Sequence, residues 1–269
     1  MLIWLYIAPV IAFIATLLAT PIWIRYLRKI NLLVLDQNKK DKPLVPISGG
    51  LAVMCGMLSG FMTYIFVSIF VYHLAYELLF LFAGILTILL TTLIGFFDDL
   101  VITNPHASSG LKQWQKPLLT LFTAVPLMVV NAGSSTMSVP FFGAVNFGLL
   151  YPLVIIPIAV VGASNMVNML AGLNGMETGM GIIYIGMLGL YGYVHNEYTA
   201  AVIAVITFSA LVAFYFYNKV PAAILPGDSL TYLLGGALVT IAIVGNLEKA
   251  ALISSIPFFL EFILKYRGK

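Results

Sequence analysis

Long apolar runs, separated by short polar breaks, make up most of the chain. A helix needs about 20 apolar residues to cross the hydrocarbon core of a membrane. Runs of roughly this length recur, and they predict an all-α, polytopic bundle of membrane helices that holds all 269 residues in one domain. We expect nine spans, near residues 2–24, 49–72, 78–97, 117–131, 146–163, 176–194, 198–217, 229–245 and 250–265.

Two of these runs carry further signals. Trp4 and Trp23 stand near the ends of the first run, as interfacial anchors do, and the run lacks the small-residue cleavage pattern of a signal peptide. We therefore expect it to remain as a span. The fourth run is short, and the weak alternation from Ser134 to Phe142 after it predicts a small extracytoplasmic hairpin at the membrane surface.

Composition narrows the class of protein. Only 9% of the residues are charged and the mean hydropathy is +1.05, which excludes a soluble domain of this length, because it could not cover its own surface. The single cysteine, Cys55, offers neither a disulfide nor a thiolate metal site. The basic residues form no dedicated domain, so nucleic acid is not an expected partner.

The basic residues also orient the bundle. If the amino terminus is outside, the loops 25–48, 98–116, 164–175 and 218–228 and the carboxyl end hold every Lys and Arg except Lys249. Basic loops stay in the cytoplasm, so we expect these segments to be cytoplasmic. The short opposite connections hold three residues that we expect to be ordinary solvated turn residues, namely His73, His195 and Glu197.

The stretch from Ser164 to Gly181 is polar for its surroundings. It reads SNMVNMLAGLNGMETGMG and contains Asn165, Asn168 and Asn174. Polar side chains at membrane depth usually face a cavity, an ion or one another. The first two asparagines would share a helix face and the glycines let a ligand approach, so a phosphate or metal site is one interpretation. Helix packing through small residues and amide bonds is the alternative.

Two cytoplasmic segments place charges beside the membrane. In DQNKKDKPLVPISGG, Lys42 precedes a glycine-rich helix start, which suits an anion; a positive-inside flank is the alternative. In GFFDDL, Asp98 and Asp99 are adjacent carboxylates that a cation or a phosphate-bound metal would relieve, and Lys116 lies on the same side. A solvated helix end is a weak alternative, because carboxylates oppose the dipole at a helix carboxyl end.

Asp228 follows a glycine in ILPGDSL, at the expected first turn of the eighth span. As a helix cap it would need no further explanation. Together with Asn168, however, it offers two hard oxygen ligands on one membrane face. Magnesium usually takes one or two protein oxygens and completes its shell with water and substrate phosphate. The pair therefore predicts a Mg²⁺ site for a nucleotide diphosphate, with Mn²⁺ as the alternative ion.

Four segments in chain order, KPLVPISGG, GFFDDL, NMVNMLAGLNGMETG and PGDSL, resemble the polyprenyl-phosphate N-acetylhexosamine-1-phosphate transferases. The resemblance covers essentially the whole chain. AGLNG around Asn174 is similar to the eukaryotic and archaeal UDP-N-acetylglucosamine:dolichyl-phosphate N-acetylglucosamine-phosphotransferases. The bacterial peptidoglycan branch typically has aspartates at the positions of Ala171 and Asn174, which argues against a muramoyl-pentapeptide substrate.

The resemblance implies catalytic and metal-binding roles. Asp228 and Asn168 would hold the magnesium that bridges the pyrophosphate of the UDP-sugar. Asp98 and Asp99 match paired aspartates, one of which acts on the lipid phosphate or orients a basic neighbour. Lys116 matches a lysine that contacts phosphate.

The resemblance also implies a set of substrate-binding residues. Asn174, with Gly172 nearby, matches the uracil-reading position, and Lys42 lies in the first of the four segments. Asn165 matches a second asparagine, for which we expect a supporting polar role. Leu225 stands where relatives often place an aromatic side chain against the base, which is a departure from the family.

The implied reaction joins UDP-N-acetylglucosamine to a polyprenyl or dolichyl phosphate and releases UMP. Because a phosphate monoester is already a dianion near neutral pH, Asp98 is either a base or an electrostatic organiser. The implied setting is the plasma membrane of an archaeal-like prokaryote, with the site in the cytoplasm and a homodimer left open. The family continues into a basic loop and a final span where this sequence ends at KYRGK, so we expect a truncated chain.

A transporter or channel is the competing class, because it too places polar residues and broken helices near a membrane face. Transporters usually show an internal repeat and a site near the bilayer midplane. No repeat is evident here, and the polar residues cluster on one side. A purely structural scaffold is disfavoured by the paired aspartates.

Overall fold

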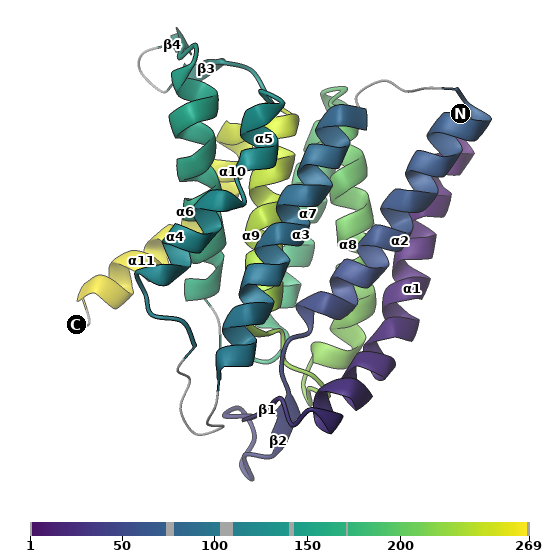
Figure 1. Ribbon diagram of the computed structural model, residues 1–269, viewed down its shortest axis with the longest axis vertical. Coiled ribbons are helices and arrows are strands. Elements are labelled where there is room, and N and C mark those ends of the chain that lie inside the picture. The colour runs from purple at the N-terminus through teal and green to yellow at the C-terminus, as the bar shows by residue number, and fades with distance from the viewer. Residues whose placement is uncertain (1, 74–77, 103–109, 140–142, 171, 268–269) are drawn as a thin grey trace.

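The computed structural model describes residues 2–73, 78–102, 110–139, 143–170 and 172–267, and most of them lie in packed helices (Figure 1). The longer helices are α1 (Leu2–Lys29), α2 (Gly50–Phe66), α3 (Leu78–Val101), α6 (Ile156–Met169), α7 (Met176–Val194), α8 (Tyr198–Asn218) and α9 (Gly227–Val244). The shorter ones are α4 (Gln115–Phe122), α5 (Val125–Val129), α10 (Glu248–Ser254) and α11 (Ile256–Arg267), with π-helical turns η1 (Val67–Val71) and η2 (Tyr151–Ile155).

Within the described residues, six helices are long and apolar enough to cross a membrane. They are Tyr6–Lys29, Gly50–Val71, Leu78–Val101, Tyr151–Met169, Tyr198–Asn218 and Gly227–Val244. The predicted all-α membrane bundle is therefore confirmed, and these six correspond to six of the nine expected spans. The expected span at 176–194 forms α7, which is not among these six helices. It is rich in glycine and tyrosine and carries Glu177 in its first turn.

The two other expected spans are interrupted. The run at 117–131 forms α4 and α5, which are separated at Thr123, just before Pro126. The run at 250–265 forms α10 and α11, which are separated at Ser255, just before Pro257. Proline has no N–H and is best tolerated in the first turn of a helix, and Pro126 and Pro257 each stand in the first turn of the second helix. The structure thus has two broken helices where we expect continuous spans.

α9 is the centre of the bundle, and it packs against α3, α6 and α8. In its membrane-spanning window 83% of the residues are buried, compared with 28% for the peripheral α1. Its close approach to α3 depends on Gly95, because a Cβ atom there would lie 2.3 Å from the backbone oxygen of Asp228. The first turn of α9 is therefore held directly against the last turns of α3.

Two small antiparallel hairpins lie at opposite ends of the bundle (Figure 1). β3 (Thr136–Val139) pairs with β4 (Gly143–Asn146), which confirms the predicted hairpin, although it extends past the expected end; residues 140–142 lie outside the described part. β1 (Leu33–Leu35) pairs with β2 (Leu44–Pro46), a hairpin that the apolar pattern does not predict. The carboxyl end of α3 and the amino end of α9 lie at the β1–β2 end.

Candidate active site

Two buried carboxylates stand near the carboxyl end of α3. Asp98 is 1% exposed and Asp99 is 0% exposed, so the pair is not a solvated helix end. Asp98 accepts a hydrogen bond from the N–H of Leu111 through Oδ1, and its Oδ2 forms an ion pair with Lys116. These partners are needed because an unpaired charge is costly to bury.

Lys116, at the start of α4, contacts two carboxylates. Its Nζ lies 2.8 Å from Asp228 Oδ2 and also contacts Asp98. Burial opposes the charged form of Lys116, but the two carboxylates outweigh it and raise the pKa of the ammonium above its ordinary value. Lys116 is therefore protonated at neutral pH. We call Asp98, Lys116 and Asp228 the charged cluster; it has two carboxylates for one ammonium group.

Asp99 caps the helix that carries Asp228. Its Oδ1 accepts a hydrogen bond from the N–H of Asp228 at 2.8 Å, and its Oδ2 accepts one from the N–H of Ser229 at 3.1 Å. These N–H groups belong to the first turn of α9, where no intrahelical partner exists. Gly227 permits the approach, because its φ is +70° and a Cβ there would lie 2.5 Å from Asp99 Oδ2. Asp99 is thus a positioning residue for Asp228.

Asp228 does not cap its own helix. Its Oδ2 accepts hydrogen bonds from Lys116 Nζ and, at 3.2 Å, from Asn168 Nδ2. Asn168 in turn accepts a hydrogen bond through Oδ1 from the Thr231 hydroxyl at 3.1 Å. The helix-cap interpretation of Asp228 is therefore wrong, since Asp99 does the capping. The two predicted metal ligands, Asn168 and Asp228, are in direct contact.

α6 continues further than predicted and carries both asparagines of the polar stretch. The expected span ends at residue 163, whereas the helix ends at Met169, so Asn165 and Asn168 lie within it. Asn165 donates through Nδ2 to the Thr120 hydroxyl at 3.3 Å and accepts through Oδ1 from the Tyr232 hydroxyl at 3.4 Å. These bonds link α6 to α4 and α9 beside the charged cluster.

A second polar cluster joins the β1–β2 loop to the segment between α6 and α7, and we call Asp36, Asn38 and Asn174 the loop cluster. Asn174 donates through Nδ2 to Asp36 Oδ2 at 2.9 Å and accepts through Oδ1 from Asn38 Nδ2 at 3.1 Å. Asn38 Nδ2 also donates to the carbonyl of Gly172 at 3.0 Å. Asp36 and Asn38 are not among the residues predicted from the sequence; their one signal is polarity within DQNKKDK.

The carboxylate of the loop cluster is fully compensated. Asp36 is 0% exposed, and it also accepts a hydrogen bond from the N–H of Asn38 at 3.0 Å and pairs with Lys39 Nζ at 3.2 Å. Burial alone would raise the pKa of Asp36, but the hydrogen bonds from Asn174 and Asn38 and the ion pair lower it below its ordinary value. Asp36 is therefore ionised at neutral pH and can only accept hydrogen bonds.

The other predicted residues lie around these clusters. Lys42 is exposed in the β1–β2 turn at φ +41°, and in the described part of the chain no hydrogen bond or ion pair joins it to either cluster. Leu225 is half-buried, and its N–H donates to the carbonyl of Pro46 at 2.8 Å. Gly172 donates its N–H to Glu177 Oε1 at 2.7 Å. The roles of these residues in binding stay predictions.

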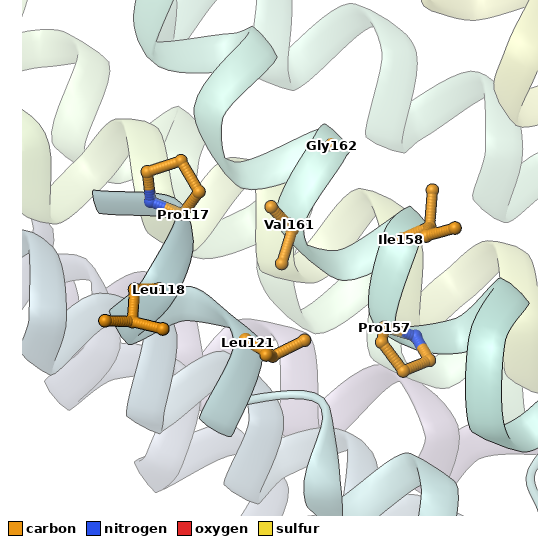
Figure 2. Close-up of a pocket in the computed structure, with 7 residues that line it drawn as sticks. All are labelled: Pro117, Leu118, Leu121, Pro157, Ile158, Val161 and Gly162. Atoms are coloured by element: carbon orange, nitrogen blue, oxygen red, sulfur yellow. The ribbon is translucent and has the colours of Figure 1, made fainter. Parts of the chain in front are cut away.

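An apolar pocket of about 520 Å³ lies between α4 and α6 (Figure 2). It is lined by apolar residues, namely Pro117, Leu118, Leu121, Pro157, Ile158, Val161 and Gly162. Pro117 directly follows Lys116 in the chain, so one lining residue of the pocket is the sequence neighbour of the charged cluster. Leu118 and Ile158 are 49% and 66% exposed, so in a membrane the pocket faces the lipid.

The donor types around Asp228 fit a hard divalent cation. Carboxylate and amide oxygens are ligands that magnesium prefers, and the charged cluster has one carboxylate more than it has ammonium groups. No three His, Cys, Asp or Glu side chains gather as a metal-binding group within the described residues. A magnesium ion would therefore depend on Asp228 and Asn168 together with ligands from a substrate.

Comparison with known proteins places the chain in a family. A sequence profile of glycosyl transferase family 4 matches residues 81–246, from the first turns of α3 to just beyond α9. The chain belongs to glycosyl transferase family 4. The matched region holds the whole charged cluster and Asn174, whereas Asp36 and Asn38 of the loop cluster precede it.

Named members of glycosyl transferase family 4 are similar over most of the chain. A Saccharolobus solfataricus protein, provisionally named UDP-N-acetylglucosamine–dolichyl-phosphate N-acetylglucosaminephosphotransferase, is 37% identical over 92% of this chain and 74% of its own length. A Sulfolobus acidocaldarius protein with the same provisional name is 30% identical over 100% of this chain and 79% of its own length. A phospho-N-acetylmuramoyl-pentapeptide-transferase of Halalkalibacterium halodurans is 30% identical over 97% of this chain and 83% of its own length. The family resemblance predicted from the four segments is confirmed.

Proposed function

We propose that the chain transfers N-acetylglucosamine-1-phosphate from UDP-N-acetylglucosamine to a polyprenyl phosphate of the dolichyl type, giving polyprenyl-pyrophosphoryl-N-acetylglucosamine and UMP. This is the first membrane step of lipid-linked glycan assembly. The names of the archaeal relatives support the choice of sugar and lipid. The observation that carries the proposal is the convergence of Asp98 and Asp228 on Lys116 beside an apolar pocket.

The charged cluster suits phosphoryl transfer. Such reactions depend mainly on positioning and on neutralising charge at the phosphate oxygens. Lys116 is held by two carboxylates, yet its side chain is 21% exposed, so it is not sealed inside the bundle. A cation that is fixed in advance costs no reorganisation during the reaction, which makes it effective in catalysis.

Magnesium is part of the proposal, with manganese as the alternative ion. Asp228 and Asn168 would hold it. Asn168 Oδ1 accepts one hydrogen bond, from Thr231, and keeps a second lone pair for an ion. When bound, the ion would supply neutralisation of the charge on the pyrophosphate. Asp99 supports this role by fixing the backbone of Asp228.

In the proposed step, an oxygen of the lipid phosphate attacks the β-phosphorus of UDP-N-acetylglucosamine. The new P–O bond forms while the bond from the β-phosphorus to the bridging oxygen breaks, and UMP leaves with that oxygen. The second pKa of a phosphate monoester is about 6, so the lipid phosphate is largely a dianion at neutral pH and needs no strong base. Asp98 then acts by holding Lys116 in place.

The apolar pocket would take the part of the polyprenyl chain next to the phosphate. Its lining by residues of α4 and α6 is apolar and offers no hydrogen-bonding side chain among those seven residues. Because Pro117 follows Lys116 directly, a lipid in this pocket would carry its phosphate toward the ammonium group. This arrangement supports an isoprenoid phosphate as the acceptor.

The proposed location is the plasma membrane of a prokaryote, with the active site facing the cytoplasm. The archaeal relatives support a prokaryotic source. The distribution of charge supports the orientation, because the loops on the side of the charged cluster, together with the carboxyl end, hold every Lys and Arg except Lys249.

The test is a transfer assay with radiolabelled UDP-N-acetylglucosamine and a polyprenyl phosphate in detergent. We expect label to enter the lipid phase as the pyrophosphoryl-linked sugar, with UMP released, in Mg²⁺ or Mn²⁺ and not in EDTA. Equal transfer in EDTA would reject the role of the metal. Uptake of unchanged nucleotide sugar into sealed proteoliposomes, without lipid product, would instead identify a transporter.

A further inference from the structure

Gly162 in α6 is a glycine that neither close packing nor backbone conformation requires. Outside the backbone of its own helix, a Cβ atom at this position would meet no atom within 4 Å. By contrast, Gly235 permits the packing of α9 on α6, because a Cβ atom there would lie 2.5 Å from Ser164 Cα. Gly162 is also helical and is not among the residues with positive φ. Glycine is a poorer helix former than alanine, so the helix itself does not explain this residue.

The space left by Gly162 opens into the apolar pocket. Gly162 lines the pocket together with Ile158 and Val161, at the spacing that places residues on one face of a helix. Leu118 and Leu121 of α4 lie across from them (Figure 2). All the other lining residues carry a branched side chain or a proline ring. The wall of the pocket therefore has a recess at Gly162 that is one side chain wide.

The recess lies toward the end of the pocket that is nearer to the charged cluster. Of the lining residues in α6, Gly162 is the closest along the helix to Asn168, at a rise of about 9 Å. Asn168 donates to Asp228 Oδ2 at 3.2 Å. Pro117, which follows Lys116 in the chain, lies toward the same end of the pocket as Gly162 (Figure 2). A lipid with its phosphate at Lys116 would have the first part of its chain beside Gly162.

The shape of the recess distinguishes two kinds of lipid chain. An isoprenoid chain carries methyl branches along its length, whereas an n-alkyl chain has none. In a membrane, apolar groups gain little by leaving the surrounding lipid, so the fit of packed atoms decides how well a chain binds. A methyl branch can fill the recess and contact its wall. A straight chain leaves the recess empty and loses those contacts.

We infer that Gly162 is a specificity-determining residue that makes the acceptor site select a methyl-branched isoprenoid phosphate over a straight-chain alkyl phosphate. The inference rests on the proposed function, which supplies a polyprenyl phosphate as the acceptor. The charged cluster cannot make this selection, because Lys116 acts on the phosphate and both lipids carry one.

The experiment uses the detergent-solubilised chain and measures three constants. They are the KM for polyprenyl phosphate, the KM for UDP-N-acetylglucosamine and the inhibition constant of a long n-alkyl phosphate. Gly162→Ala places a methyl group in the recess. We expect the KM for polyprenyl phosphate to rise by roughly tenfold, the effect of one methylene group in an apolar pocket, and the other two constants to change little. Gly162→Leu fills the recess, and we expect a larger rise in the KM for polyprenyl phosphate.

Thermal unfolding and a matched control separate this role from a structural one. Alanine and leucine are better helix formers than glycine, so the Tm of both variants should equal or exceed that of the parent. The control is Gly179→Ala in α7, where a Cβ atom would lie 3.7 Å from Tyr215 Cε2, an ordinary contact outside the pocket. We expect its three constants to equal those of the parent.

Two results would overturn the inference. One is an unchanged KM for polyprenyl phosphate in both variants of Gly162. The other is a parallel rise in Gly162→Ala of the inhibition constant of the n-alkyl phosphate or of the KM for UDP-N-acetylglucosamine, because the recess would then not recognise branches. If Gly162→Leu does not fold, Gly162→Ala alone decides.

Failure of the proposed function would look different. A parent chain that makes no lipid-linked sugar would reject the proposed function. A parent that makes the product, with constants that do not respond to the residue at position 162, would reject the inference and leave the proposed function intact.

Discussion

The charged cluster and the loop cluster lie at the same end of the bundle, yet their charges are balanced differently. In the charged cluster, Asp98 and Asp228 share the single ammonium group of Lys116. In the loop cluster, Asp36 pairs with Lys39, whose ammonium group otherwise donates to the carbonyl of Ala222, and accepts further hydrogen bonds from neighbouring amides. A buried carboxylate that is incompletely compensated leaves room for a ligand, whereas a compensated one fixes its neighbours. The comparison therefore separates residues that act on a substrate from residues that position them.

The largest expected effect comes from removing charge in the charged cluster. Asp228→Asn keeps the shape of the side chain and an oxygen for Lys116, so folding should be preserved. It removes the charge that would hold a metal, and we expect transfer to fall by about 10²–10³-fold. Radiolabel transfer and thermal unfolding of the same preparations check this. Parent-level transfer in Asp228→Asn would show that the metal is misplaced.

A smaller effect on transfer, with a larger effect on stability, is expected for Asp99→Asn. The new NH₂ group cannot accept the N–H of Ser229, so one buried donor in the first turn of α9 loses its partner. We expect a loss of about 1–2 kcal/mol, which is a Tm decrease of about 2–8 °C. Asp98→Asn is the matched variant, and for it we expect loss of transfer with little change in Tm. Loss of transfer in Asp99→Asn at an unchanged Tm would make Asp99 a catalytic residue.

The smallest expected effect is the pH dependence of the loop cluster. The folded state lowers the pKa of Asp36, so its contribution to stability is present above the unfolded pKa, about 3.9, and is lost as the pH falls through the folded value. The Tm of the parent should exceed that of Asp36→Asn by about 1–3 °C near pH 7, and the difference should close below about pH 4. Asp41→Asn, which removes the same charge from an exposed position in the same loop, should show no such difference. A gap that widens on acidification contradicts this assignment.

The spans could be predicted because a bilayer admits few alternatives to an apolar helix. The apolar pattern continues through the breaks before Pro126 and Pro257, and proline alone does not mark a break, because Pro9 and Pro21 lie inside the continuous helix α1. The β1–β2 hairpin was not predictable, since strands of three residues leave no alternation to detect.

The candidate site could be predicted in part. Asp98 and Asp228 stand out because charge near the membrane is expensive, and their family match adds Lys116. The capping role of Asp99 could not be predicted, because its partner in α9 is 129 residues away and the contact exists only after the helices pack. Asp36 lies in a polar stretch with the composition of an ordinary loop, so the sequence does not indicate its contact with Asn174.

The apolar pocket between α4 and α6 has a kinetic consequence for the proposed reaction. A lipid that reaches Lys116 through this pocket arrives by lateral diffusion within the bilayer. Its effective concentration is then its mole fraction in the membrane, whereas that of the nucleotide sugar is an ordinary molarity. Adding inert phospholipid would slow the reaction even when the total amount of each substrate is unchanged. The rate law therefore combines a surface density with a bulk concentration.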